Sequence, residues 1–324
     1  MNEKSAATRP MSAVVWAQLL LLGAIWGGSF FFARIAVEEI APFTLVLLRV
    51  AIAAAALHVY LLARGISFAP TFLAWRGLLL LGAVNNVVPF SLMFLGQTEI
   101  GAGLASVLNA TTPFWTIIVA SFLVADEKIT SGKLAGIALG IAGTAVMIGP
   151  GLLAGLGGPV WAKLALIGTA LSYAFAFVVA KRITGLSPTL IATGQLTASS
   201  VIMVPIVVVL DDTSQMLTAS AQTWSAVLGL ALLSTAFAYI LYFRILASAG
   251  ATNASLVTLI VPVSALLLGI LFLGERLEAF EAVGIGLIGC GLLVIDGRAV
   301  TALRRRRRGL PARIAAPEPT KKST

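Results

Sequence analysis

Two stretches of the chain decide the fold: LGAVNNVVPFSLMFLGQTEIGAGLASVLNATTP at 81–113 and LALLSTAFAYILYFRILASAGATNASLVTLIVP at 230–262. They align without a gap at an offset of 149 residues. The aligned pairs include Gly101 with Gly250, Ala105 with Ala254 and Pro113 with Pro262. Unrelated apolar segments would not keep one offset over such a length, so the stretches indicate an internal duplication.

The duplication extends in both directions from these stretches. After a shift of one residue, Gly136 falls on Gly284, and near the start of the chain Gly23 matches Gly168 at an offset of 145. The repeated unit is therefore about 145–149 residues long, which is nearly half of the 324 residues.

The composition excludes a soluble protein. Hydrophobic residues make up 59% of the chain, charged residues only 11%, and the mean hydropathy is +1.01. A soluble domain carries about 25% charged residues. A single cysteine, Cys290, and a single histidine, His58, leave no disulfide framework and no Cys or His cluster for a metal. We expect a polytopic membrane protein without a cofactor.

Apolar runs long enough to span a bilayer recur along the whole chain. A membrane-spanning helix needs roughly 20 mostly apolar residues. The runs lie at 14–34, 42–63, 76–95, 102–124, 134–150, 160–180, 189–210, 223–243, 252–273 and 280–297. The sequence thus predicts an all-α membrane protein with ten transmembrane helices, five in each repeat.

The distribution of Lys and Arg predicts the orientation. With ten spans both termini share one side, which carries 18 of the 22 Lys and Arg residues, against 3 on the other side. By the positive-inside rule, segment 1–13 and the basic tail 297–324 are expected in the cytoplasm. The net charge of +9 then reflects membrane topology, with anionic lipid as a secondary partner, and predicts no nucleic-acid binding.

Five spans per repeat is an odd number, so the second copy would enter the membrane from the opposite face. Inverted repeats are typical of alternating-access transporters, whose substrate site lies near the bilayer midplane between the repeats.

Several motifs resemble those of a known family. They are the first-span segment Trp26-Gly27-Gly28-Ser29-Phe30, the second-span pair Leu48-Arg49, the two aligned prolines, and Gly274-Glu275 with its counterpart Asp126-Glu127. In this order the chain resembles a drug/metabolite transporter of the EamA type, with repeats at 14–148 and 160–296. The resemblance implies a ten-helix bundle around a central cavity that exports small metabolites, often amino acids, from the bacterial cytoplasm through the inner membrane. We expect a monomer.

Polar residues inside spans predict which helices line the cavity. Asn86, Pro89 and Met93 are spaced to share one helix face. The repeat alignment places Thr235 at the position of Asn86, and Thr258 at that of Asn109. Such residues either face a cavity or hold helices together; we favour the cavity for these pairs. The candidate substrate-binding residues are Trp26, Arg49, Asn86, Asn109, Thr112, Tyr173, Thr235, Tyr239 and Thr258.

Arg49 leaves two interpretations open. A buried arginine needs a partner, which is either a substrate carboxylate or a structural carboxylate such as Glu38 or Glu39. We favour the structural ion pair at this point.

No predicted span carries Asp or Glu near its middle. Exchange of cationic drugs for protons commonly uses such a carboxylate, so neutral or zwitterionic substrates fit better. The chain also lacks a P-loop and a catalytic set, so we expect no enzyme. The alternatives are a multidrug or nucleotide-sugar-like transporter of the same fold, a channel and an intramembrane enzyme.

Overall fold

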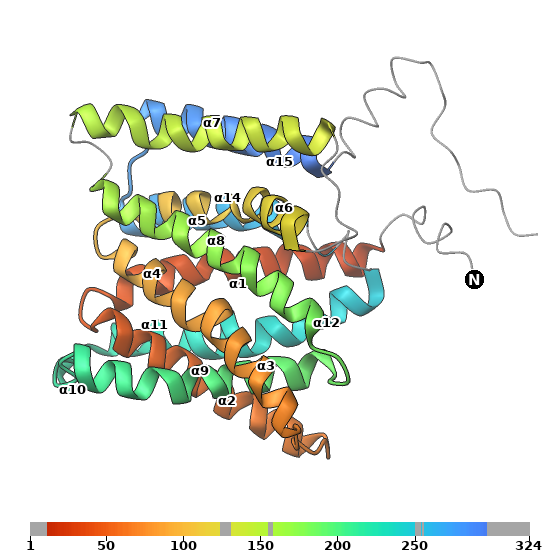
Figure 1. Cartoon of the computed structure of the whole chain (residues 1–324). Coiled ribbons are helices and arrows are strands. Elements are labelled where there is room, and N and C mark those ends of the chain that lie inside the picture. The colour runs from red at the N-terminus through yellow and green to blue at the C-terminus, as the bar shows by residue number, and fades with distance from the viewer. Residues whose placement is uncertain (1–11, 124–130, 155–157, 250–253, 255, 297–324) are drawn as a thin grey trace, which may run out of the picture.

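The computed structural model describes residues 12–123, 131–154, 158–249, 254 and 256–296 (Figure 1). Within these ranges the chain is helical, with short connections and no β-strand. Residues 1–11 of the predicted N-terminal segment, the tail 297–324 and the Asp126-Glu127 pair lie outside the described residues.

The helices follow one another with short gaps. The first half contains α1 (Ala13–Ala36), α2 (Pro42–Ala63), α3 (Phe72–Gly82), η2 (Ala83–Val87), α4 (Val88–Gln97), α5 (Ala102–Asn109), α6 (Thr112–Leu123) and α7 (Ser131–Ala154). The second half contains α8 (Val160–Arg182), α9 (Pro188–Leu210), α10 (Gln215–Thr218), α11 (Ala221–Leu228), η3 (Gly229–Phe237), α12 (Ala238–Ala249), α14 (Val257–Leu273) and α15 (Ala279–Asp296).

Each of the ten predicted apolar segments falls on helical structure. Seven helices of the described chain are long and apolar enough to cross a membrane: Ala13–Ala36, Pro42–Ala63, Phe72–Gln97, Ala102–Leu123, Val160–Arg182, Pro188–Leu210 and Ala221–Ala249. Three further apolar helices are shorter: Ser131–Val146, Val257–Leu273 and Ala279–Ile295. Large apolar side chains such as Phe122 (83% exposed) and Val208 (76% exposed) point outward, as a lipid-facing surface requires.

Local sequence signals explain where the helices begin. The hydroxyl of Ser12 accepts a hydrogen bond from the Val15 N–H at the start of α1, and Thr71 and Ser187 cap α3 and α9 in the same way. Such caps satisfy N–H groups that have no partner inside the helix. Pro42 occupies the first position of α2, where its missing N–H costs nothing.

The two halves exchange contacts in a reciprocal pattern. Helix α1 packs against α14 and against the α11–η3–α12 segment of the second half. Its counterpart α8 packs against α4, α5 and α6 of the first half, and α2 packs against α9. Helices α7 and α15, the last helix of each half, lie side by side along one edge of the bundle (Figure 1).

Glycines bring α7 and α15 close together. A Cβ on Gly136 would lie 2.8 Å from the Gly291 carbonyl oxygen, and one on Gly143 would lie 2.8 Å from the Gly284 carbonyl oxygen. A Cβ on Gly132 or Gly286 would meet nothing within 4 Å. The close approach therefore uses Gly136 and Gly143 on α7 with Gly284 and Gly291 on α15.

A π-helical segment recurs at equivalent places in the two halves. Segment η2 interrupts the third apolar segment at Ala83–Val87, and η3 interrupts the eighth at Gly229–Phe237. The repeat offset of 149 residues carries 83–87 onto 232–236, inside η3. A π-turn contains an extra residue and changes the direction in which later side chains point.

Candidate substrate site

A large cavity lies between the two halves. Its volume is about 840 Å³, within the range of small-molecule sites. Every described helix except α10 and α11, together with both π segments, contributes side chains to its wall. Residues far apart in the sequence therefore meet around one space.

Eight of the nine candidate residues contribute to the cavity wall. They are Trp26, Arg49, Asn109, Thr112, Tyr173, Thr235, Tyr239 and Thr258. The wall also contains Asn85 and Gln195, which were not among the candidates.

Asn86 is the exception, and its expected placement is wrong. Its side chain is completely buried away from the cavity, and Nδ2 donates a hydrogen bond to Ser199 Oγ at 3.0 Å. The prediction assumed a regular α-helix between Asn86 and Met93. The π-turn η2 breaks that periodicity, so Asn85 faces the cavity and Asn86 joins η2 to α9.

Arg49 is held on the cavity wall by two contacts. Its Nε donates to Thr235 Oγ1 at 3.0 Å, and its guanidinium carbon lies 3.7 Å from the centre of the Phe90 ring. The residue is 5% exposed, and Nη1 is buried without a hydrogen-bond partner. An unpaired buried charge is costly, and a nearby anion would lower that cost.

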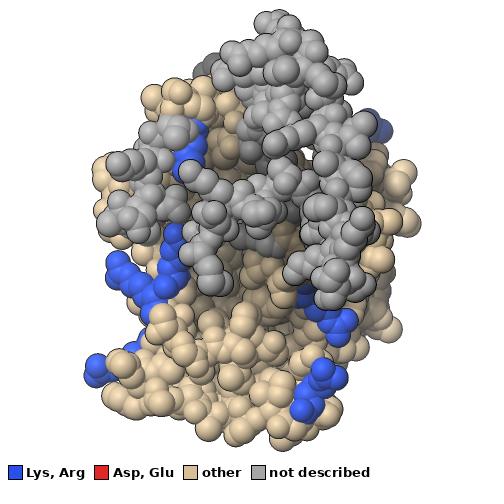
Figure 2. Space-filling view, turned by 90° about the vertical axis from the view of Figure 1, so that its right-hand side faces the viewer, with Lys and Arg blue, Asp and Glu red and all other residues tan. Residues whose placement is uncertain are grey.

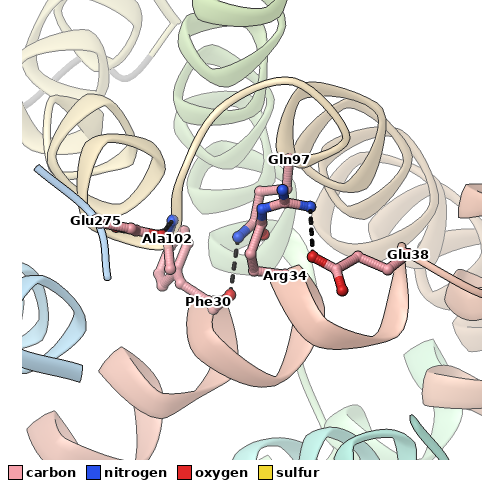
Figure 3. Close-up of polar contacts among 6 residues, drawn as sticks. All are labelled: Phe30, Arg34, Glu38, Gln97, Ala102 and Glu275. Carbon is pink, nitrogen blue, oxygen red and sulfur yellow. Dashed lines mark hydrogen bonds and ion pairs between the residues drawn. The ribbon is translucent and has the colours of Figure 1, made fainter. Parts of the chain in front are cut away.

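The expected ion pair of Arg49 with Glu38 or Glu39 does not form. Glu38 instead pairs with Arg34 at 3.4 Å, as Figure 3 shows. Glu39 Oε2 accepts the Ser220 N–H at 2.6 Å, and this bond holds the pKa of the Glu39 carboxyl below its usual value. Both carboxylates are therefore engaged elsewhere.

An amide–phenol network lies on another part of the wall. Asn85 Nδ2 donates to Gln195 Oε1 at 3.0 Å and lies 3.4 Å from the Tyr239 hydroxyl. Gln195 on α9 and Tyr239 on α12 thus bind the π segment of the first half. The network offers several neutral hydrogen-bonding groups to a ligand.

Most of the remaining wall is apolar or aromatic, and the described lining contains no Asp or Glu. Trp26 and Tyr242 lie with ring centres 5.5 Å apart at one side of the cavity. The cationic residues among the described lining are Arg49 and Lys133. The cavity therefore combines an apolar surface with positive charge.

The fourth apolar segment is broken where it meets the cavity. Helix α5 ends at Asn109, Ala110 and Thr111 form a turn, and α6 starts at Thr112. Pro113 lacks the N–H that would continue the helix. Asn109, Ala110, Thr112 and Pro113 all line the cavity. Broken helices of this kind commonly form binding sites in transporters.

One end of the bundle is tied together by side-chain to backbone bonds. Gln97 Nε2 donates to the Phe30 carbonyl at 2.8 Å, and the Glu275 carboxylate accepts the N–H of Ala102 (Figure 3). At the same end, Asp211 Oδ2 accepts the Thr44 N–H at 2.6 Å. These bonds link helices from both halves.

The opposite end is basic. In Figure 2 this face shows Lys and Arg, and no Asp or Glu among its described residues. The cavity extends toward this end, since Ala180 near the end of α8 and Pro188 at the start of α9 line it. The cavity is therefore asymmetric with respect to the two ends.

His58 lies outside the cavity lining. Its Nε2 is 3.0 Å from Thr197 Oγ1, and its ring packs edge-on against Phe68. This setting agrees with the structural, hydrogen-bonded role that is usual for a lone histidine.

The apolar helices and the cavity define a multi-pass membrane transporter. The chain belongs to the EamA-like transporter family, whose model matches residues 11–149 and 160–296. The chain is 30% identical over 291 residues to an uncharacterized inner membrane transporter, YedA, of Escherichia coli, covering 87% of this chain and 90% of that protein.

A second relative is the "Probable terminal-alkyne amino-acid exporter" of Streptantibioticus cattleyicolor, 27% identical over 304 residues, with 94% of this chain and 99% of that protein covered. One solved crystal structure superposes with a TM-score of 0.63 at 22% identity and covers 90% of this chain and 98% of its own. That likeness concerns the fold alone.

Proposed function

We propose that the protein is a secondary transporter that exports small carboxylate-bearing metabolites, above all amino acids and related zwitterions, across the inner membrane by alternating access. Arg49 carries the proposal: its guanidinium is buried in the cavity wall, and the described lining offers it no carboxylate. A substrate carboxylate would supply the missing partner. The amino-acid exporter among the relatives supports the same substrate class.

The proposed architecture is ten transmembrane helices in two inverted five-helix repeats, at 14–148 and 160–296. The reciprocal packing of α1 and α8 supports it, and so do the π segments at equivalent positions. Because a single chain encloses the cavity, the proposed working unit is a monomer. We also propose that the protein moves its substrate without a chemical reaction.

The proposed orientation puts both termini and the basic end in the cytoplasm. In this orientation the cavity extends toward the cytoplasmic end. At the opposite end, here called the acidic end, the carboxylates of Glu275 and Asp211 bond to backbone N–H groups of the first half. Export then requires the bonds at the acidic end to break after the substrate has bound.

Counterflow into proteoliposomes tests the proposed substrate class. Vesicles containing the purified protein are loaded with unlabelled L-phenylalanine, and entry of labelled L-phenylalanine is competed with L-leucine and with L-phenylalanine methyl ester. We expect L-leucine to compete and the ester, which lacks the carboxylate, to compete at least about 10-fold less well, since a hydrogen-bonded charge contributes about 1.5–3 kcal/mol. Equal competition by the ester would contradict a carboxylate site at Arg49.

A further inference from the structure

The α5–α6 wall of the cavity presents hydrogen-bond acceptors and few donors. The hydroxyl of Ser106 donates to the Gly103 carbonyl at 2.6 Å, that of Thr112 to the Asn109 carbonyl at 2.6 Å, and that of Thr116 to the Thr112 carbonyl at 2.9 Å. All three residues line the cavity. Because their protons are engaged by the backbone, these hydroxyls can offer only oxygen lone pairs to a ligand.

Two further oxygens at this wall accept no hydrogen bond within the described part of the chain. Asn109 Oδ1 is buried without a partner. Among the hydrogen bonds of the described residues, none ends on the carbonyl oxygen of Ala110. The sequence explains the second case: Pro113 has no N–H, and the N–H of Phe114 bonds to Thr111 instead. Buried acceptors without donors are rare in folded proteins.

The helix end adds a negative partial charge at the same place. The C-terminus of α5 lies at Asn109, where its last carbonyls concentrate the negative end of the helix dipole. The N-terminus of α5 is occupied by the Glu275 carboxylate, which accepts the N–H of Gly103 at 2.9 Å. Half-helix ends of this polarity bind cations in other transporters.

We propose that the end of α5, with Asn109 Oδ1 and the Ala110 carbonyl, binds the ammonium group of the substrate. An ammonium has three N–H donors and no acceptor, which is the complement of this wall. The inference rests on the proposed function, in which Arg49 on α2 binds the carboxylate. The two positions together would distinguish a zwitterion from a plain carboxylic acid without any acidic residue in the cavity.

Paired probes test this subsite. Purified protein in proteoliposomes is assayed with L-phenylalanine against 3-phenylpropionate and with L-leucine against 4-methylpentanoate, so that each pair differs in the ammonium group. We expect the wild type to prefer the amino acids by about 10-fold or more, the loss expected for a hydrogen bond to a charge. Asn109→Leu should reduce this preference below about 3-fold by weakening the amino acids alone, and Asn109→Asp should increase it.

Ser121→Ala provides a matched control on α6, because Ser121 bonds to the Ile118 carbonyl and does not line the cavity. Asn109→Asp keeps the size of the side chain, so it tests the same position even if Asn109→Leu does not fold. An unchanged preference in both Asn109 variants would overturn the subsite and leave the carboxylate site intact.

Binding of 2-phenylethylamine separates the two proposals further. This probe has the ammonium group and no carboxylate. If no carboxylate probe is transported but the amine stabilises the wild type and not Asn109→Leu, the proposed substrate class fails and the ammonium subsite stands. If neither the amine nor any amino acid binds, the subsite is overturned.

Discussion

Arg49 Nε donates a hydrogen bond to Thr235 Oγ1 at 3.0 Å, joining residues 186 positions apart in the chain. Thr235 lies in the π segment η3 and is itself bonded to the Leu230 carbonyl at 2.8 Å. The contact connects α2 of the first half to the second half at the cavity wall. It fixes one edge of the guanidinium at the cavity wall.

Replacing Thr235 by Val should loosen Arg49 without removing its charge. The donor of this hydrogen bond is charged, and such a bond contributes about 1.5–3 kcal/mol, so we expect KM for L-phenylalanine uptake to rise about 10-fold or more with little change in the maximal rate. Thr218→Val, on the short exposed helix α10, provides the control. An unchanged KM in Thr235→Val would show that substrate binding does not depend on the hydrogen bond between Arg49 and Thr235.

The Glu275 carboxylate fills a space bounded by glycines. A Cβ on Gly269 would clash with Glu275 Oε2, and a Cβ on Gly101 would lie 2.5 Å from the carboxyl carbon. We therefore expect Gly269→Ala to lower the melting temperature of the purified protein by displacing the carboxylate from α5. Gly286→Ala, where a Cβ meets nothing within 4 Å, should leave it unchanged.

Glu275→Gln should destabilise the protein as well, because a capping group contributes about 0.5–2 kcal/mol. The double variant Gly269→Ala/Glu275→Gln then tests whether the two sites act through one contact. A melting-temperature loss equal to the sum of the single losses would mean that they are independent.

The Glu39–Ser220 bond at the acidic end should be insensitive to mild acid. The bond lowers the pKa of Glu39, so its contribution is present above the ordinary carboxyl pKa and is lost only as the pH falls through the lowered value. Between pH 7 and pH 5 we expect unchanged labelling of a cysteine placed at Ser220 in the Cys290→Ser background, measured relative to a cysteine at the exposed position Thr218, because the reactive thiolate becomes scarcer at pH 5 for both thiols. Glu39→Gln should increase that labelling at both pH values. A rise in labelling between pH 7 and pH 5 in the protein with Glu39 intact would contradict the lowered pKa of Glu39.

The fold could be predicted largely from the sequence because its signals are long. Apolar runs of membrane length and a fixed repeat offset survive local irregularities, and each predicted run falls on helical structure. The ends of helices at Ser12, Thr71 and Ser187 also follow from ordinary capping residues.

The site was predicted less well, for two physical reasons. Asn86 was assigned by the periodicity of a regular α-helix, and the π-turn η2 at Ala83–Val87 removes that regularity. Asn85 and Gln195 then meet across the two halves, a contact that no spacing within one helix reveals. The repeat alignment offered a signal, since Ser234 and Thr235 occupy both aligned positions and either asparagine could have faced inward.

Arg49 was given the wrong partner because a sequence shows proximity along the chain and not in space. Glu38 and Glu39 precede α2, yet Glu38 follows Arg34 by one helical turn and pairs with it, and Glu39 binds Ser220. Arg49 instead contacts the Phe90 ring and the Thr235 hydroxyl. Only the folded arrangement shows that Glu38 and Glu39 bind other groups.

Counterflow of L-phenylalanine by Arg49→Gln in proteoliposomes tests the central claim most directly. Arg64→Gln, which removes an exposed cation at the end of α2, provides the matched control, and the melting temperature in detergent verifies folding. We predict that Arg49→Gln loses at least about 10-fold in uptake, while Arg64→Gln transports like the wild type. Uptake by a folded Arg49→Gln protein at the wild-type rate would contradict the claim that Arg49 binds the substrate carboxylate.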